Sequence, residues 1–211
     1  MGYRIPAFEL RPYMNVVELA KTRVMPLTGQ PYSFDMTPYF EEPCRFLDDV
    51  ASTCRVVISA PSQSGKSEIM LNFVAHIAIY DPAPSLLIMD TSNNSYKFSS
   101  GRVKPLLRDF VKLPAFEDTS ISNRNDDKKK AVSEYSLSNN SPLYIGGSVS
   151  LSDLCSKPCK YLVLDELARF YEGKEGSSVD LALKRQMRFR GMALLTSTPT
   201  VADNYITQYW R

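Results

Sequence analysis

A loop of small residues stands before Lys66, where a strand and a helix are expected to meet. It reads Ala60-Pro61-Ser62-Gln63-Ser64-Gly65-Lys66-Ser67. In this order, backbone N–H groups and the positive end of the helix are directed at phosphate oxygens. Gly65 permits close approach, Lys66 neutralises the β- and γ-phosphates, and the Ser67 hydroxyl is a ligand for Mg²⁺. The segment therefore predicts a phosphate-binding loop, although Ala60 replaces the usual first glycine.

An acidic pair, Asp165-Glu166, follows a short apolar run. Asp165 at the end of a strand would face the metal directly or through water, and Glu166 would polarise the water that attacks the γ-phosphate. Taken alone, such a pair is more often a solvated strand end. Open α/β sheets gather their ligands at the carboxyl ends of the strands, so the pair downstream of a phosphate loop favours the catalytic interpretation.

A further apolar run ends in three residues with hydroxyl side chains, Thr196, Ser197 and Thr198. If this strand lies between the phosphate-loop strand and the acidic strand, its tip comes within hydrogen-bonding reach of the reaction centre. We therefore expect these hydroxyls to sense the γ-phosphate and couple the site to the rest of the fold. A simple Thr/Ser-rich turn before Pro199 is the alternative.

The elements that position these residues alternate along the chain. Strands are expected at 55–59, 85–90, 143–146, 161–165 and 192–197, and helices at 68–80 and about 96–112. Pro105 is expected to kink or split the second helix. Runs that are apolar throughout are typical of strands buried on both faces of a parallel sheet. We predict a doubly wound α/β fold of the P-loop NTPase class, RecA- or helicase-like, of the additional-strand, catalytic-glutamate (ASCE) type.

The expected domain organisation is a single ATPase domain. Residues 1–54 are aromatic and interrupted by prolines, and are expected to wrap around a P-loop core at 55–211. Residues 119–141 are polar and are read as a solvated excursion, in which three lysines could alternatively contact DNA phosphates.

The composition limits the classes of protein to which this chain can belong. The 211 residues fit one large domain, and 25 Lys+Arg against 23 Asp+Glu leave a net charge of +2, so any contact with DNA must be local. Four cysteines are too few for a disulfide scaffold and fit a reducing cytoplasm. No apolar run approaches the roughly 20 residues that span a bilayer, and the N-terminus lacks a signal-peptide core, so a soluble, unexported protein is expected.

Three segments resemble the ATPase motifs of the lambda-like large terminase family of tailed bacteriophages. They are Ser62-Gln63-Ser64-Gly65-Lys66-Ser67-Glu68, Leu162-Val163-Leu164-Asp165-Glu166 and Leu195-Thr196-Ser197-Thr198-Pro199-Thr200. Thr37-Pro38-Tyr39, residues 148–158 and Lys184-Arg185 also resemble family segments, so the similarity runs from about residue 30 to 205. Tyr39 is a candidate stacking surface for the nucleotide, and a buried core tyrosine is the alternative.

This resemblance implies an ATPase that uses Mg²⁺ and drives double-stranded DNA through a portal protein into an empty procapsid. It implies a ring of copies docked transiently on the procapsid in the host cytoplasm, with a small terminase subunit as a partner. The family's second half, a metal-dependent nuclease with an RNase-H-like fold, has no counterpart here, so no nuclease activity is expected. Arg102 resembles the family's arginine that reaches the next subunit's nucleotide; a solvated helix arginine is the alternative, and Arg108, Arg185 and Arg188 are competitors.

Other classes of protein remain as alternatives. A GTPase would carry an Asn-Lys-x-Asp motif, which the sequence lacks. A helicase-like ATPase acting on nucleic acid shares the acidic pair and the Ser/Thr motif, but it needs a second RecA-like domain for which no length remains. A non-catalytic nucleotide-binding capsid component would keep the fold without needing Glu166.

Overall fold

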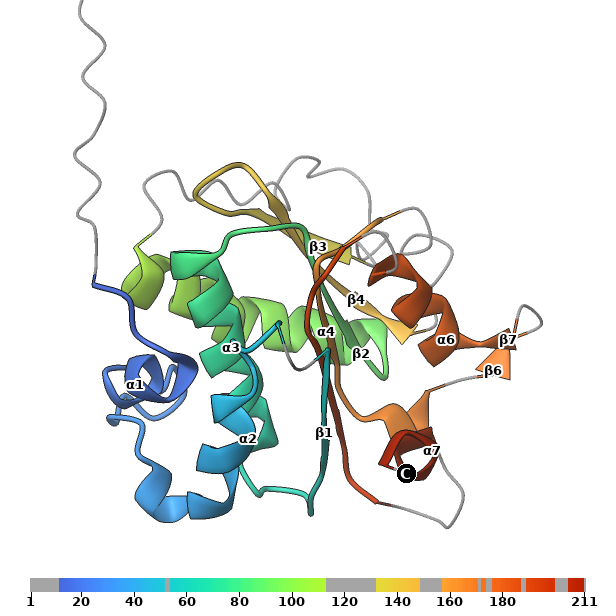
Figure 1. The fold of residues 1–211 in the computed structure, drawn as a ribbon, viewed down its shortest axis with the longest axis horizontal. Helices are drawn as coiled ribbons and strands as arrows, with labels where there is room; N and C mark the ends of the chain where they lie inside the picture. The colour runs from blue at the N-terminus through green and yellow to red at the C-terminus, as the bar shows by residue number, and fades with distance from the viewer. Residues whose placement is uncertain are drawn as a thin grey trace, which may run out of the picture.

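A six-stranded sheet forms the centre of the computed structural model, which describes residues 12–51, 54–112, 132–148, 157–170, 172–173, 176–186, 189–199 and 205–210. In spatial order the strands are β1 (Arg55–Ser59), β8 (Ala193–Ser197), β5 (Tyr161–Leu164), β2 (Ser85–Met89), β4 (Pro142–Gly147) and β3 (Val132–Ser136). All neighbouring strands are parallel except β4 and β3, which are antiparallel. The predicted α/β fold with a mainly parallel sheet is confirmed (Figure 1).

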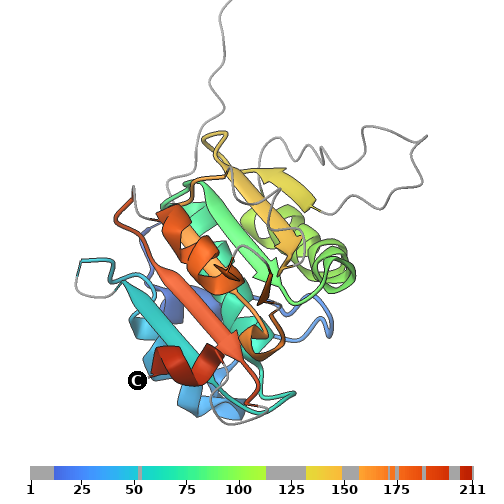
Figure 2. The same ribbon diagram turned by 90° about the vertical axis from the view of Figure 1, so that its right-hand side faces the viewer.

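Helices cover both faces of this sheet (Figures 1 and 2). One face carries α1 (Val16–Lys21), α2 (Glu41–Arg45), α3 (Lys66–Tyr80) and the helix formed by α4 (Ser92–Phe98), η3 (Ser99–Val103) and η4 (Leu106–Val111); the other carries α6 (Ser178–Leu183) and α7 (Tyr205–Trp210). Shorter elements are η1 (Phe34–Met36), η2 (Pro38–Phe40), η7 (Leu167–Arg169), η8 (Lys184–Gln186) and the two-strand pair β6 (Glu172–Gly173) and β7 (Gly176–Ser177).

Alternate residues of each central strand enter different cores. Leu87 and Val163 pack in the core under α3, whereas Leu86 and Leu162 pack in the core under α6 and α7. Side chains alternate between the two faces of a strand, and here both faces are apolar and buried. The same burial explains why these strands could be predicted from continuous apolar runs.

The segment before β1 packs on α3. Helix α1 begins at the N-cap Asn15, whose side chain accepts a hydrogen bond from the backbone N–H of Glu18, while the Glu18 side chain accepts one from the N-cap N–H. This reciprocal arrangement satisfies two N–H groups at the start of the helix. Val16 and Leu19 of α1 are buried in the core that α3 also lines. Residues 1–11 of the expected wrapping segment lie outside the described residues.

Two local predictions need correction. The helix after β2 begins at Ser92, capped by Thr91, and it continues past Pro105 without ending. Pro105 has no N–H to donate, and π-helical turns flank it on both sides, which is how the helix accommodates the missing hydrogen bond. The polar stretch 119–141 was expected to be a solvated excursion. It contains β3, an antiparallel strand paired with β4 at the edge of the sheet.

Among the described residues, no helix is both long enough and apolar enough to cross a membrane.

Candidate nucleotide-binding site

The loop between β1 and α3 has the backbone of a phosphate cradle. Gly65 is the N-cap of α3 with a φ of 97°, in the left-handed region that favours glycine. A Cβ at Gly65 would lie 3.2 Å from Cγ2 of Thr37, so the segment before β1 also limits this position. Gln63 has a φ of 60°, which is uncommon for a residue with a side chain. Left-handed positions of this kind occur in the backbone turns whose N–H groups bind anions.

Lys66 lies within the curve of this loop and is buried. Its ammonium donates to the carbonyl oxygens of Ala60 at 2.9 Å and Pro61 at 2.7 Å, and to Oγ1 of Thr198 at 3.0 Å. A lysine ammonium has three N–H donors, so these three acceptors use all of them. A phosphate oxygen must replace at least one of the three to be bound by Lys66.

Tyr39 lies beside the loop and is exposed, with 57% of its surface accessible. Its hydroxyl donates to the carbonyl oxygen of Ser64 at 3.0 Å, and its ring contacts Phe40 edge-on. The alternative of a buried core tyrosine is therefore excluded. An exposed aromatic face beside a phosphate loop is available for stacking.

Asp165 and Glu166 follow β5 at the carboxyl edge of the sheet. Asp165 is buried, and its backbone N–H donates to the carbonyl oxygen of Ile88 on β2 at 2.9 Å. Burial raises the pKa of Asp165 to about 6, which the hydrogen bond from Thr196 opposes and the neighbouring Glu166 carboxylate reinforces. Glu166 has a φ of 57° and ψ of 46°, a left-handed backbone that residues with a Cβ rarely adopt. Strained conformations of this kind are typical of functional sites.

The hydroxyl tip of β8, formed by Thr196, Ser197 and Thr198, contacts the acidic pair and the turn that follows it. Oγ1 of Thr196 donates to Oδ1 of Asp165 at 2.6 Å. Oγ of Ser197 accepts the backbone N–H of Ala168, in the turn after Glu166, at 3.0 Å. Oγ1 and the backbone N–H of Thr198 donate to the two carboxylate oxygens of Glu166, at 3.1 and 3.3 Å. Because β8 lies between β1 and β5, this tip joins the phosphate loop to the acidic pair.

Glu68, in the first turn of α3, is held by two arginines. Oε2 accepts a 2.6 Å hydrogen bond from Arg23, whose side chain is fully buried and also donates to Oδ1 of Asn72 at 2.7 Å. Oε1 lies 3.8 Å from a guanidinium nitrogen of Arg102, whose side chain is 27% exposed. The carboxylate of Glu68 thus contacts arginines, while its backbone belongs to the helix start that faces the loop.

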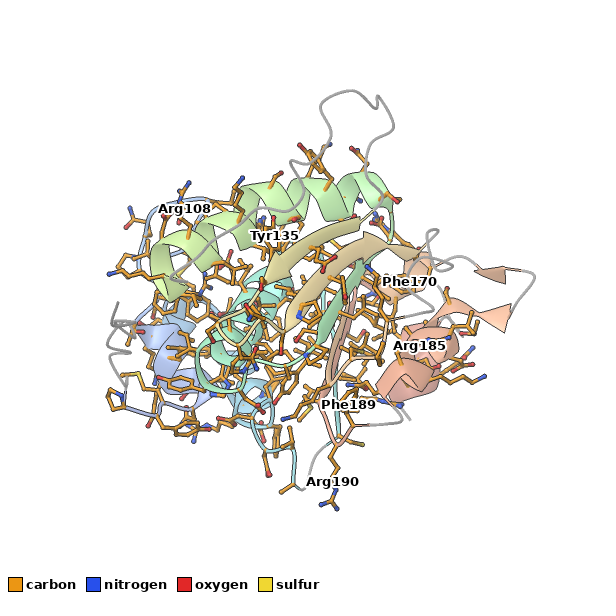
Figure 3. All side chains as sticks on the ribbon, turned by 90° about the horizontal axis from the view of Figure 1, so that it is seen from above. Arg108, Tyr135, Phe170, Arg185, Phe189 and Arg190 are labelled. Atoms are coloured by element: carbon orange, nitrogen blue, oxygen red, sulfur yellow. The ribbon has the colours of Figure 1, made fainter. Side chains whose placement is uncertain are left out.

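The structure separates the candidate arginines. Arg108 is paired with Asp109 through two hydrogen bonds of 2.6 and 2.7 Å. The carbonyl oxygen of Arg185 accepts the N–H of Cys159, just before β5, so this residue lies at the amino edge of the sheet, opposite Glu166. In Figure 3, Arg108 and Arg185 lie on different sides of the molecule. Arg188 falls outside the described residues. Of the three candidates that the structure describes, Arg102 is the one with a contact to Glu68, in the first turn of the helix after the phosphate loop.

Sequence reasoning missed three charged residues near the site, Arg23, Asp90 and Arg169. Arg23 stands alone in a proline-punctuated segment, and no pattern distinguishes it from a surface arginine. Asp90 follows the apolar strand β2 just as Asp165 follows β5, so the same signal could have found it. Asp90 is buried, accepts from the N–H of Thr91, and lies 3.8 Å from the guanidinium of Arg169.

The donors at the site suit a hard divalent cation. Ser67 and Asp165 offer a hydroxyl and a carboxylate oxygen, and Mg²⁺ is usually held by one or two protein oxygens together with phosphates and water. Within the described part of the chain, no three His, Cys, Asp or Glu residues gather into a metal cluster. The buried Asp165, whose pKa is raised by desolvation, is a position where a cation would favour the charged carboxylate.

Asp165→Asn is expected to stabilise the metal-free domain at pH 8. The pKa of Asp165 in the folded chain, about 6, exceeds the ordinary 3.8, so the charged form opposes folding above pH 6 and this penalty disappears as pH falls toward 4. A shift of this size corresponds to about 3 kcal/mol at most. Urea unfolding in the presence of a chelator from pH 4 to pH 8 measures the effect. The gap between the variant and the wild type should close below pH 6.

The exposed Asp35 provides the control, because Asp35→Asn should leave the free energy of unfolding nearly unchanged across this range. Parallel stability curves for Asp165→Asn and the wild type would contradict the burial argument.

Comparisons with known proteins identify the family and the fold. The family model for the phage terminase large subunit gpA, ATPase domain, matches residues 28–211. Among solved structures, the large terminase of bacteriophage HK97 is 13% identical with a TM-score of 0.68, and the match covers 93% of this chain and 40% of that one. The large terminase ATPase domain of Thermus phage P74-26 is 17% identical with a TM-score of 0.54, over 89% of this chain and 74% of that one. No curated protein matches the sequence.

At these identities, the two solved structures show that the fold is shared. This chain spans 40% of the length of the HK97 large terminase that it matches. The family match extends over the phosphate loop, the acidic pair and the hydroxyl tip of β8, and it favours a terminase over the GTPase and helicase alternatives. The chain belongs to the family of phage terminase large subunit gpA ATPase domains.

Proposed function

We propose that this chain binds ATP with Mg²⁺ and hydrolyses it, with Lys66 on the phosphates and Glu166 as the general base for the attacking water. The observation that carries this proposal is the hydrogen-bonded link from Lys66 through Thr198 to Glu166, which joins the phosphate loop to the acidic strand end. Phosphoryl transfer depends mainly on positioning and charge neutralisation, and these groups supply both.

The nucleotide would lie along the loop between β1 and α3. Backbone N–H groups of the loop would cradle the phosphates at the N-terminus of α3, a helix of 15 residues. The residues proposed for this role are Ser62, Gln63, Ser64, Gly65, Lys66, Ser67 and Glu68. Tyr39, exposed beside Ser64, is proposed to stack on the adenine.

Ser67 and Asp165 are proposed to hold Mg²⁺. The ion would supply positive charge to the β- and γ-phosphate oxygens. Thr196 would fix the orientation of Asp165, because its hydroxyl donates to the carboxylate at 2.6 Å. Deprotonated Asp165 is the form that binds a cation, so nucleotide binding that depends on Mg²⁺ should weaken as pH falls below about 6.

Arg102 is proposed as the arginine that completes charge neutralisation, acting on the nucleotide of a neighbouring copy. Its contact with Glu68 is 3.8 Å, longer than a hydrogen bond, and its side chain is partly exposed. Its guanidinium also lies over the ring of Phe98, 5.7 Å from the ring centre. Neither contact fixes the side chain as two hydrogen bonds fix Arg108.

In the whole subunit, ATP hydrolysis is proposed to drive double-stranded DNA through the portal protein into a procapsid. The motor would be a ring of copies docked on the portal in the host cytoplasm and would act with a small terminase subunit. Family membership supports these partners. Thr196, Ser197 and Thr198 are proposed to couple the state of the γ-phosphate to the sheet, because they join β8 to the turn after β5.

Lys66→Ala is expected to weaken ATP binding by roughly 10–100-fold, because hydrogen bonds from a charged donor contribute about 1.5–3 kcal/mol. Turnover should fall below detection. Calorimetric titration with ATP and an assay of phosphate release measure the two effects, with thermal unfolding as a check on the fold.

Lys97→Ala is the matched control, because Lys97 is an exposed lysine of α4 and is not part of the loop. Unchanged affinity and turnover in Lys66→Ala would mean that the loop does not bind phosphate.

A further inference from the structure

Thr198 lies between the two charged groups proposed to act on ATP. Its hydroxyl oxygen accepts a hydrogen bond from the ammonium of Lys66 at 3.0 Å and donates its proton to Oε1 of Glu166 at 3.1 Å. A hydroxyl has one proton, so with Lys66 as donor its proton is directed to Glu166. The two hydrogen bonds therefore have fixed directions.

Thr198 holds Glu166 through two atoms. Its backbone N–H donates to Oε2 of Glu166 at 3.3 Å, while its hydroxyl donates to Oε1. Two donors from one residue fix the rotation of the carboxylate about its last bond, which a single hydrogen bond leaves broad. A general base must present one oxygen to its substrate in a narrow range of positions, so this rotation affects the reaction.

The three hydroxyls at the tip of β8 have different partners. Thr196 binds Asp165, and Ser197 binds the N–H of Ala168 in the turn that follows Glu166. Ser197 thus supports the left-handed backbone of Glu166, whereas Thr198 contacts its carboxylate. Substituting each hydroxyl in turn therefore tests a different part of the site.

We infer that Thr198 is a positioning residue for the reaction. It orients the carboxylate of Glu166, and its hydroxyl links that orientation to Lys66 through a second hydrogen bond. The inference rests on the proposed function, because it assigns Glu166 the role of base. Where a phosphate oxygen replaces Thr198 among the three acceptors of Lys66, the same hydroxyl reports phosphate binding to the carboxylate. The contact of the Thr198 backbone N–H with Glu166 does not involve Lys66.

Thr198→Val tests this role, because valine has nearly the shape of threonine and lacks the hydroxyl. The turnover number for ATP should fall by roughly 10–100-fold, as expected for a misoriented reacting group, while KM changes little. Thr198→Ser keeps a hydroxyl and should restore most of the turnover. Thr196→Val is the matched control: it should change the Mg²⁺ concentration needed for half-maximal activity, because its partner is Asp165.

A double variant separates positioning from structural support. If Thr198 acts through Glu166, Thr198→Val should not slow Glu166→Gln further, whereas independent effects would multiply. Thermal unfolding of each variant checks the fold, and if valine perturbs it, comparing Thr198→Ala with Thr198→Ser gives the same test. Wild-type turnover in Thr198→Val, or multiplied losses in the double variant, would overturn the inference and leave the proposed function standing. The proposed function itself fails if Lys66→Ala and Glu166→Gln both retain turnover.

Discussion

Assemblies that mix Arg102→Ala chains with Glu166→Gln chains are expected to recover ATP hydrolysis that neither variant shows alone. Glu166→Gln should lower turnover by roughly 10²–10⁴-fold, because an amide can orient water but cannot take its proton. Arg102→Ala should lower turnover to a similar extent, since arginines that act in trans on phosphoryl transfer contribute about 10³–10⁵-fold. In the ring proposed above, mixed assemblies contain some interfaces that pair an intact Glu166 with an intact Arg102 from the neighbouring copy.

Phosphate release from assembled motors, measured across mixing ratios, checks this expectation. Recovery should be greatest at intermediate ratios and vanish at either end. Arg108→Ala is the control, because Arg108 lies on the same helix and is exposed and paired with Asp109. Arg102 has no part in the mechanism if Arg102→Ala is fully active alone, or if rings shown to be mixed remain inactive.

Arg23→Met should destabilise the domain by about 3–5 kcal/mol, because it leaves the carboxylate of Glu68 poorly paired in a buried environment. Arg23 is fully buried, donates to Glu68 and Asn72, and stacks on Tyr32 at 5.2 Å from the ring centre. Urea unfolding measures the loss. Adding Glu68→Gln should recover part of it, because the unpaired charge is then gone.

Arg45→Met is the comparison, because Arg45 pairs with Glu41 on α2 and its side chain is 66% exposed. An exposed pair of this kind contributes well under about 1 kcal/mol. Equal losses for Arg23→Met and Arg45→Met would show that burial does not set the strength of the Arg23–Glu68 pair.

The central strands could be predicted because both of their faces are buried. Runs such as the one that forms β5 are apolar at every position, and this pattern can be recognised without knowing the neighbouring strands. Strand β3 could not be found in this way. It is an edge strand within a polar stretch, and its pairing with β4 depends on backbone hydrogen bonds that leave no periodic pattern of apolar residues.

The residues of the candidate site likewise fall into those that the sequence predicts and those that it does not. The phosphate-loop segment and the acidic pair are each contiguous in sequence. Their positions after β1 and β5 could therefore be predicted from Gly65, Lys66 and Asp165 standing next to strand patterns. Arg23 becomes part of the site only through its contact with Glu68, between residues far apart in the chain. The sequence around a single arginine does not show whether its side chain is buried, because tertiary packing determines its partner.

The position of β8 has a consequence for how the protein can fold while it is being synthesised. β8 is the last strand of the main sheet to be synthesised, yet it lies between β1 and β5. Until it emerges, the strand that leads into the phosphate loop lacks its neighbour, and an inner edge of the sheet is open to other chains. Pairs such as Val56 with Leu194 join distant parts of the chain, which makes closure of the sheet a slow step. A nascent chain that stalls before β8 therefore exposes unpaired strand edges that are prone to aggregate, and it lacks the hydroxyl tip of the candidate nucleotide-binding site.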